Sequence, residues 1–227
     1  MPIVLFHDSS PSGDITGQVL QLVVSYLTDL SMLAVPASNP LYRVYEWALP
    51  CEVDLYIQRI GRQPDAPVEL IVAFAEDNPA EVVGFLLYLP VKSHPEACGI
   101  NYMAVKKSHR RRGIGREMME RAIARYPHVE LTCSVAKVPY YEKMGFQVLD
   151  SHHCQIVMNT RCESTPGMMG ICDVEAIYRS PQVQQIQSQL LQRWGLKEIQ
   201  NAQKQLERHA EQMTQKAMAF AQGRLAK

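Results

Sequence analysis

The feature that most constrains the fold is the stretch from residue 100 to residue 126, where three patterns follow one another. Residues 100–105 are rich in strand-forming side chains, residues 106–113 are mostly basic, and residues 114–126 repeat apolar side chains every three or four positions. This order predicts a strand, a basic loop and an amphipathic helix. The apolar face of such a helix packs against a sheet, so the stretch indicates an α/β protein.

The basic loop has the properties of an anion-binding turn. Gly113 and Gly115 have no Cβ, so the backbone can turn tightly and approach a ligand closely. The amides that open the following helix have no partner within it and bind phosphate groups well. Guanidinium groups add forked donors suited to a pyrophosphate or a 3′-phosphate. The arginines concerned are Arg110, Arg111, Arg112 and Arg116.

Other interpretations of this loop fit less well. A dinucleotide fingerprint requires a third glycine where Met118 stands. A nucleotide-triphosphate loop requires a closing Gly-Lys-Ser/Thr that the sequence lacks. A nucleic-acid patch would not need two glycines followed by an amphipathic helix. A solvated loop on an ordinary α/β domain is the plain alternative.

Two motifs, in this order, resemble the GNAT family of N-acetyltransferases. The pattern Arg-x-x-Gly-x-Gly at residues 110–115, after a strand that ends Met-Ala-Val, is similar to the acetyl-coenzyme A signature of the family. Residues 140–146 (YYEKMGF) are similar to its closing Tyr-Glu-Lys-x-Gly-Phe motif. The part of the chain that carries the resemblance runs from about residue 68 to residue 158.

The resemblance implies an α/β (α+β) fold of the GNAT type, with a mixed, mostly antiparallel sheet flanked by helices. Residues 68–74 and 82–89 are rich in strand formers and predict an antiparallel hairpin before the cofactor strand. A helix is expected over residues 15–30, and a second over 41–60 with an interruption at Pro50. The remaining expected elements are strands at 3–6, 129–135, 146–149 and 154–158 and a short helix at 138–144.

The domain organisation is expected to change at residue 160. Residues 1–160 would form a GNAT-like acetyltransferase domain, residues 161–180 a linker, and residues 181–227 a helical C-terminal arm. The arm is a long helical extension with a narrow apolar stripe and a candidate kink at Gly195. Such a stripe suits packing on a partner protein, on another copy or back on its own domain, and the sequence favours none of these over the others.

The resemblance also implies roles for individual residues. Acetyl-coenzyme A would be the co-substrate, without a metal. Tyr141 matches the general acid of the family, which protonates the departing thiolate. Ser134 stands where the family often has asparagine, and Lys107 replaces a frequent proline. The expected cofactor-binding residues are Met103, Ala104, Val105, Arg110, Arg111, Arg112, Gly113, Ile114, Gly115, Arg116 and Ser134.

The acceptor side is less constrained. Residues 98–105 contain no carboxylate, whereas histone-type members of the family place a glutamate on this strand. The general base therefore stays open between Glu96, His94 and a water held by Asn101 or Tyr102. The polar loop at residues 92–97 is expected to border the site. The two early helices would form one wall of it, with Tyr42, Tyr45, Glu46, Trp47, Glu52 and Asp54 as candidate substrate contacts.

Charge and cysteine content limit the partners and the compartment. Lys+Arg and Asp+Glu both number 23, so nothing global favours nucleic acid or an anionic membrane as a partner. Six cysteines without a CxxC pattern, no leader and no long apolar run predict a cytoplasmic protein with free thiols.

We expect an acetyl-coenzyme A-dependent N-acetyltransferase that acts by direct transfer to an amine, either a small molecule or a protein. We also expect a homo-oligomer or a protein partner through residues 181–222. The alternative is a non-catalytic GNAT-fold assembly or interaction protein that works through that arm.

Overall fold

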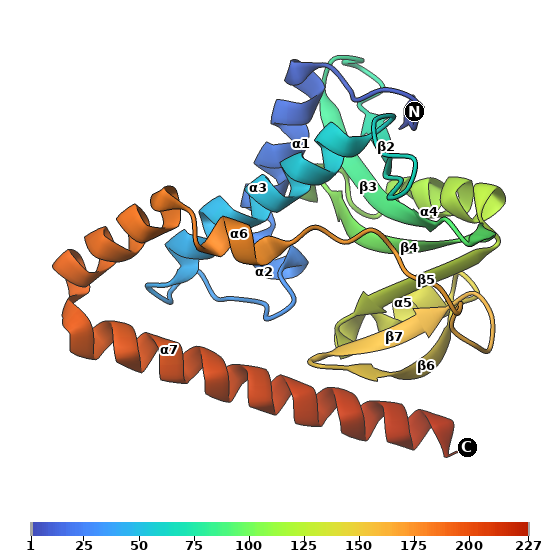
Figure 1. Ribbon diagram of the computed structural model, residues 1–227. Coiled ribbons are helices and arrows are strands. Elements are labelled where there is room, and N and C mark those ends of the chain that lie inside the picture. Colours follow the sequence, from blue (N-terminus) through green and yellow to red (C-terminus); the bar gives the residue numbers. More distant parts are fainter. Residues whose placement is uncertain (1, 227) are drawn as a thin grey trace.

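The centre of the sheet is the antiparallel hairpin that the sequence predicts. Strands β2 (Glu69–Phe74) and β3 (Val82–Val91) are buried along their whole length, as expected for apolar strands covered on both faces. Their side chains alternate between two cores, with Leu70 in one and Ile71 in the other. The computed structural model describes residues 2–226 and places this hairpin between two layers of helices (Figure 1).

The sheet has seven strands in the order β1-β2-β3-β4-β5-β7-β6. Strands β4 and β5 run parallel, and every other neighbouring pair is antiparallel. The mixed, mostly antiparallel sheet expected from the sequence is therefore confirmed. The remaining strands are β1 (Ile3–Phe6), β4 (His94–Val105), β5 (His128–Cys133), β6 (Gln147–His152) and β7 (Gln155–Asn159).

Helices cover both faces of the sheet. Helices α4 (Ile114–Arg125) and α5 (Val138–Glu142) bury their apolar side chains in one core, and α4 lies over β2, β3 and β4. Helices α1 (Gly13–Ser25) and α3 (Tyr42–Arg59) bury theirs in the other. The strand–loop–helix unit predicted for residues 100–126 is thus present, with the apolar face of α4 against the sheet.

The first helical stretch differs from the prediction. We expected one helix over residues 15–30, but the chain breaks at Tyr26 and continues as the single turn α2 (Leu27–Leu30). The Tyr26 hydroxyl accepts a hydrogen bond from the Lys107 amide, and the Tyr26 ring lies under the guanidinium of Arg110. The basic loop therefore fixes the residue at which the helix bends.

Helix α3 also differs from the prediction, because it runs through Pro50 without interruption. A proline inside a helix removes one hydrogen bond and strains the preceding turn. Val44 and Ala48 before the proline, and Val53 and Tyr56 after it, are all buried. Burial on both sides of Pro50 holds the two halves in one helix and offsets the lost bond.

The C-terminal segment contains two helices. The short helix α6 (Val174–Tyr178) lies in the stretch expected to be a linker, and its first turn is capped by the Asp173 carboxylate, which accepts from the Glu175 amide. Helix α7 (Pro181–Leu225) has a non-helical residue at Gly195, with φ 75° and ψ 161°. The candidate kink is therefore confirmed, and the part after Gly195 runs back beneath β6 and β7 (Figure 1).

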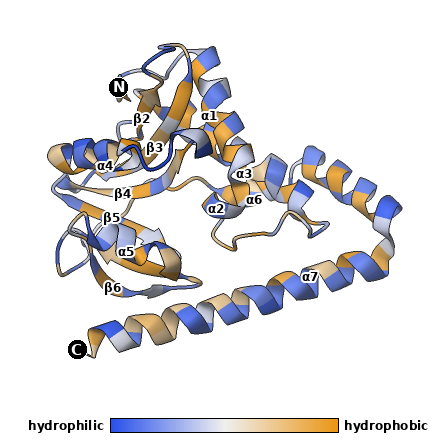
Figure 2. Cartoon of the chain, turned by 180° about the vertical axis from the view of Figure 1, so that it is seen from behind, coloured by the Kyte–Doolittle hydropathy of each residue, from blue (hydrophilic) through white to orange (hydrophobic). Residues whose placement is uncertain are grey.

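The apolar stripe of α7 packs largely on its own chain. Val183 and Leu190 contact Val44 of α3, whereas Ala217 and Ala221 join the core beside β6. Figure 2 shows the rest of α7 as a mainly hydrophilic helix with scattered hydrophobic positions. Within residues 2–226, no helix combines the length and the hydropathy needed to cross a membrane.

Candidate active site

The parallel strands β4 and β5 separate before β4 ends. Their register runs from Ala97 opposite His128 to Ile100 opposite Leu131, while β4 continues to Val105. The amide of the next residue, Lys106, donates to the Val83 carbonyl and so points toward β3. Because backbone groups alternate along an antiparallel strand, Ala104 also faces β3. Met103 and Val105 instead present their backbone groups to the gap between β4 and β5.

The turn before α4 holds the amides of the helix start open toward this gap. Gly113 caps the helix with φ 82°, a conformation that favours glycine. The first intrahelical bond runs from the Glu117 amide to the Gly113 carbonyl, so the amides of residues 113–116 have no acceptor within the helix. Gly115 allows a close approach, since a Cβ there would lie 2.8 Å from the Tyr140 hydroxyl.

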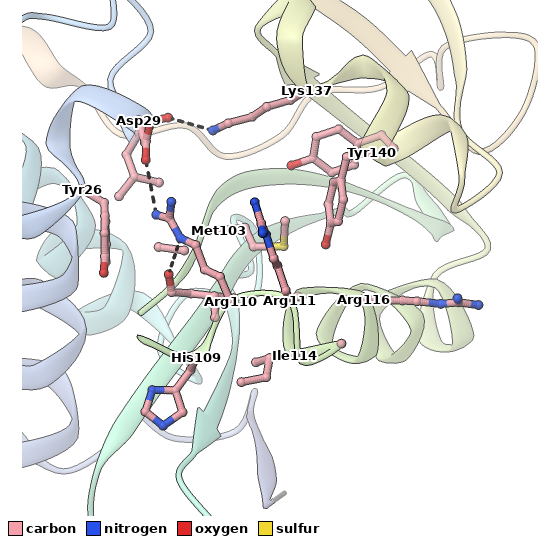
Figure 3. A pocket seen from close by; sticks show the side chains of 16 residues that line it. Tyr26, Asp29, Met103, His109, Arg110, Arg111, Ile114, Arg116, Lys137 and Tyr140 are labelled. Carbon is pink, nitrogen blue, oxygen red and sulfur yellow. Dashed lines mark hydrogen bonds and ion pairs between the residues drawn. The ribbon is translucent and has the colours of Figure 1, made fainter. Parts of the chain in front are cut away.

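A cavity of about 320 Å³ lies between this turn, the end of β4 and α5. Figure 3 shows Arg111 extending into it beside Met103 and toward Tyr140, whereas Arg116 points away along α4. We refer to it as the turn cavity. Its lining includes nearly all the expected cofactor-binding residues, namely Met103, Ala104, Val105, Arg110, Arg111, Gly113, Ile114, Gly115 and Arg116, together with Tyr140 and Tyr141.

The four arginines of the motif are not equivalent. Arg110 donates to the Val105 carbonyl at 3.0 Å, pairs with Asp29 at 3.3 Å and stacks on Tyr26, so it ties the loop to α2. Arg116 pairs with Glu120 one helical turn away, at 2.7 Å. Arg112 is exposed and lies outside the cavity lining.

Arg111 is the arginine of the motif placed to bind an anion in the turn cavity. Within residues 2–226 its guanidinium forms no ion pair or hydrogen bond. Its backbone has φ 64°, a left-handed conformation that costs an ordinary residue about 1–2 kcal/mol. Among the described arginines that line the turn cavity, the one with an unpaired guanidinium is thus the strained residue of the turn.

A second cavity, of about 570 Å³, adjoins the first. We refer to it as the acceptor cavity. It lies over β4 and β5 and is bordered by α3, the loop after α2 and the turn between β6 and β7. The two cavities share five residues, so a ligand can reach from one into the other. The shared residues are Asp29, Leu30, Met103, Lys137 and Tyr141.

Tyr141 lies at the junction of the two cavities. Its ring is 7% exposed and packs edge-on against Phe146 and Tyr140, with centroid separations of 5.7 and 5.1 Å. Burial raises the pKa of Tyr141 above that of an ordinary tyrosine, so the hydroxyl stays protonated at neutral pH. Tyr140 is 41% exposed and lines the turn cavity but not the acceptor cavity.

Ser134 lies at a different place from the other expected cofactor-binding residues. It follows β5 and lines the acceptor cavity rather than the turn cavity. Its position would allow a contact on the acceptor side of Tyr141, away from the turn before α4.

Glu52 of α3 is a half-buried carboxylate in the acceptor cavity. The Tyr102 hydroxyl donates to it at 2.8 Å. Burial raises the pKa of Glu52, and the hydrogen bond from Tyr102 offsets part of that rise. Tyr102 reaches α3 because of a β-bulge, in which Leu87 opposes Tyr102, Tyr88 opposes Ile100 and Asn101 is the extra residue.

Most of the other acceptor contacts expected from the sequence lie elsewhere. Glu46 pairs with Arg43, and Asp54 accepts from Gln58, both on the outside of α3. Tyr45 packs against Tyr178 of α6. Among the described residues that line the acceptor cavity, Glu52 is the one that comes from the six candidates. The other five candidates lie outside the lining: Tyr42, Tyr45, Glu46, Trp47 and Asp54.

The expectation that residues 92–97 border the site is wrong. Lys92 and Ser93 form a tight turn, and β4 begins at His94, at the end of the strand far from Met103. Glu96 lies 4.0 Å from His128, also at that end. Neither Glu96 nor His94 lines either cavity, so both are poor candidates for the base. Asn101 and Tyr102 do line the acceptor cavity.

Sequence reasoning missed several residues of the acceptor cavity. Met32 and Cys154 come from loops far apart in the chain and are joined by a hydrogen bond from the Cys154 thiol to the Met32 carbonyl, at 3.0 Å. The lining is completed from beyond the expected domain by Met169, Ile171, Cys172, Val174 and Met213. No local motif marks these positions, because each is brought to the cavity by long-range packing.

Comparison with known proteins bears on the fold and the family. The family model of the acetyltransferase (GNAT) domain matches residues 69–148. This match confirms the resemblance drawn from the two motifs. A search of curated proteins finds no match.

Solved structures share the fold at low identity. The PaiA N-acetyltransferase from Thermoplasma acidophilum, in complex with coenzyme A, is 14% identical over 71% of this chain and 99% of its own, with a TM-score of 0.55. A histone acetyltransferase HPA2 and related acetyltransferase from Corynebacterium glutamicum is 17% identical over 73% and 99%, with a TM-score of 0.52. An acyl-CoA N-acyltransferase from Pseudomonas aeruginosa is 16% identical over 71% and 100%, with a TM-score of 0.50.

Proposed function

With a GNAT acetyltransferase domain at residues 69–148 as the premise, we propose that this protein is an acetyl-coenzyme A-dependent N-acetyltransferase. The observation that carries the proposal is the position of Tyr141 between two connected cavities. One cavity has the donors for a diphosphate and an amide-containing arm, and the other has the half-buried carboxylate of Glu52. A direct transfer between two bound substrates needs this arrangement, because both must reach one proton donor.

The turn cavity fits the anionic and amide parts of acetyl-coenzyme A. The open amides at the start of α4 and the guanidinium of Arg111 suit the diphosphate. The backbone groups of Met103 and the amide of Val105 can pair with the pantetheine amides as a missing β-strand would, while the Val105 carbonyl accepts from Arg110. When bound, acetyl-coenzyme A supplies an acetyl group on a thioester sulfur.

Tyr141 is proposed to protonate the departing thiolate. The amine nitrogen forms the new C–N bond, the C–S bond breaks, and the sulfur takes the proton of the Tyr141 hydroxyl. The proton that the amine loses to the base returns to the Tyr141 oxygen through solvent before the next turnover. Burial favours the protonated form of this hydroxyl. General acids of this kind contribute about 10²–10⁴-fold to the rate.

Glu52 is proposed to accept the proton that the amine must lose. Its carboxylate lines the acceptor cavity, and its raised pKa makes it a better base than an exposed glutamate. Tyr102 orients it through the 2.8 Å hydrogen bond. Glu52 thereby supplies a base that the sequence of β4 does not contain.

Release of coenzyme A thiol in the presence of an amine panel tests the proposal. Acetyl-coenzyme A and the purified protein should give thiol release that depends on the amine, and mass spectrometry should find one acetyl group added to the amine. Tyr141→Phe should abolish most of the release. Amine-independent hydrolysis, or no release with any amine, would refute the proposed transfer.

A further inference from the structure

The acceptor cavity is closed by parts of the chain that lie outside the matched domain. The side chain of Met169 packs directly on Gly99 of β4, where a Cβ would meet its sulfur at 2.0 Å. Beyond it, Ile171, Cys172 and Val174 line the cavity, and Met213 of α7 borders it as well. The segment that follows the sheet therefore forms a wall of the site.

This wall is held at both ends. Before Met213, the Asn39 side chain donates to the Ala202 carbonyl of α7 at 3.0 Å, and Leu206 is buried in the core under α1 and α3. After it, Ala217 is buried beside β6, and Arg224 pairs with Glu142 of α5 at 3.3 Å. These contacts fix helix α7 on both sides of Met213, and Figure 1 shows the helix passing below β7 and β6. A cavity of about 570 Å³ behind a fixed wall suits a small molecule better than a side chain on a folded protein.

The charges in the acceptor cavity are mainly negative. Its carboxylates are Asp29, Glu52 and Glu130, and its cationic side chain is Lys137, which donates to the Asp29 carbonyl. Asp29 is paired with Arg110. Within residues 2–226, neither Glu52 nor Glu130 has an ion-pair partner; Tyr102 donates to the first and the Asn159 amide to the second.

The two carboxylates without an ion-pair partner lie beside different residues of β4. Glu130 lies opposite Gly99 in the parallel register, and Glu52 is held by Tyr102. Gly99 and Tyr102 are three residues apart, but Asn101 is the extra residue of the bulge, so they lie two steps apart on the ladder with β3, about 7 Å along the strand. Both carboxylates are half-buried, and each accepts a hydrogen bond from a neutral donor. Each therefore keeps acceptor capacity and negative charge that a positive group on the ligand would satisfy.

We propose that the acceptor is a small linear amine with a second cationic group, bound with its reacting nitrogen at Glu52 and its distal ammonium at Glu130. This inference rests on the proposed acetyl transfer and adds the substrate class. Glu130 is then a specificity-determining residue, because it contacts the part of the acceptor that does not react. The Met169 and Met213 side chains limit the width of the chain between the two charges.

Steady-state kinetics with matched amines tests the inference. Hexylamine, the butane, hexane and octane diamines, and a short lysine-containing peptide serve as acceptors. The best diamine should have a kcat/KM about 10-fold above that of the monoamine, the ratio expected when one charge-assisted hydrogen bond is added. Glu130→Gln should raise KM for that diamine about 10-fold, leave kcat unchanged and leave the monoamine unaffected.

Two controls separate this effect from a general loss of structure. Glu96→Gln removes a carboxylate at the far end of β4, outside both cavities, and should leave the diamine preference intact. Met213→Ala should admit diamines with a bulky substituent, whereas Met218→Ala on the exposed side of α7 should not.

Three results would overturn the inference. The first is an equal kcat/KM for the diamine and the monoamine. The second is a higher kcat/KM for the peptide than for any diamine, and the third is an equal fall in kcat/KM for both amines in Glu130→Gln. Each of these contradicts the acceptor class while leaving acetyl transfer intact. Absence of turnover with every amine would instead refute the proposed function, and the acceptor class with it.

Discussion

Replacing Tyr141 with phenylalanine isolates the proposed proton donor from its structural role. Phenylalanine keeps the ring that packs against Phe146 and Tyr140. The Tyr141 hydroxyl forms no hydrogen bond with any of residues 2–226, so its removal leaves no partner unsatisfied. We expect the free energy of unfolding to change by less than about 1 kcal/mol.

The kinetic effect of Tyr141→Phe should be large and confined to turnover. Loss of a general acid is expected to lower kcat by about 10²–10³-fold, which corresponds to roughly 3–4 kcal/mol of transition-state stabilisation. The dissociation constant of acetyl-coenzyme A should stay within about 2-fold, because the binding donors of the turn and of β4 are untouched.

The assay is thiol release under saturating acetyl-coenzyme A, with Tyr140→Phe as the matched control. Tyr140 is the neighbouring aromatic residue but lines the turn cavity alone, so its variant should retain most of the turnover. If Tyr140→Phe lost the activity and Tyr141→Phe kept it, the acid would be assigned to the wrong tyrosine.

Three further predictions follow from other residues. Glu52→Gln should remove the acidic limb of the kcat/KM profile, because activity rises with pH as Glu52 loses its proton, at a pKa raised above that of an ordinary glutamate. Glu69→Ala should lower the free energy of unfolding by about 3 kcal/mol, measured by urea titration. The reason is that the buried Glu69 carboxylate accepts hydrogen bonds from Arg125, Tyr88 and Tyr126. A decrease of less than about 1 kcal/mol would contradict this. Gly113→Val should weaken acetyl-coenzyme A binding at least about 10-fold in calorimetry, because a β-branched residue resists the φ of 82° that opens the turn; unchanged affinity would show that the turn geometry is not needed.

The cofactor half of the site could be predicted from sequence because it is local. Strand β4, the turn and α4 follow one another, so the motif at residues 110–115 specifies both the elements and their order. The sequence could not separate three consecutive arginines. Their directions depend on the positive φ of Arg111 and on the contacts of Arg110 with Tyr26 and Asp29, which are far away in the chain.

The acceptor half could not be predicted because it is assembled from distant segments. Glu52 meets Tyr102 through a bulge at Asn101 that shifts the register by one residue, and apolar patterning does not reveal such a shift. Met169 and Met213 reach the cavity only because the chain after residue 160 folds back over the sheet. Self-association or a partner through residues 181–222 stays a prediction, now centred on the exposed Trp194 and Leu196 beside the Gly195 kink.

The proposed function depends most on the turn before α4 as the binding site for the diphosphate, and calorimetric titration with acetyl-coenzyme A tests this assignment directly. The matched pair is Arg111→Ala and Arg112→Ala, adjacent residues of which Arg111 alone lines the turn cavity. Arg111→Ala should weaken binding by about 10- to 100-fold, the effect of one or two charge-assisted hydrogen bonds, and Arg112→Ala by less than about 3-fold. Equal affinities for wild type and Arg111→Ala, or a larger loss in Arg112→Ala, would contradict the assignment of the site.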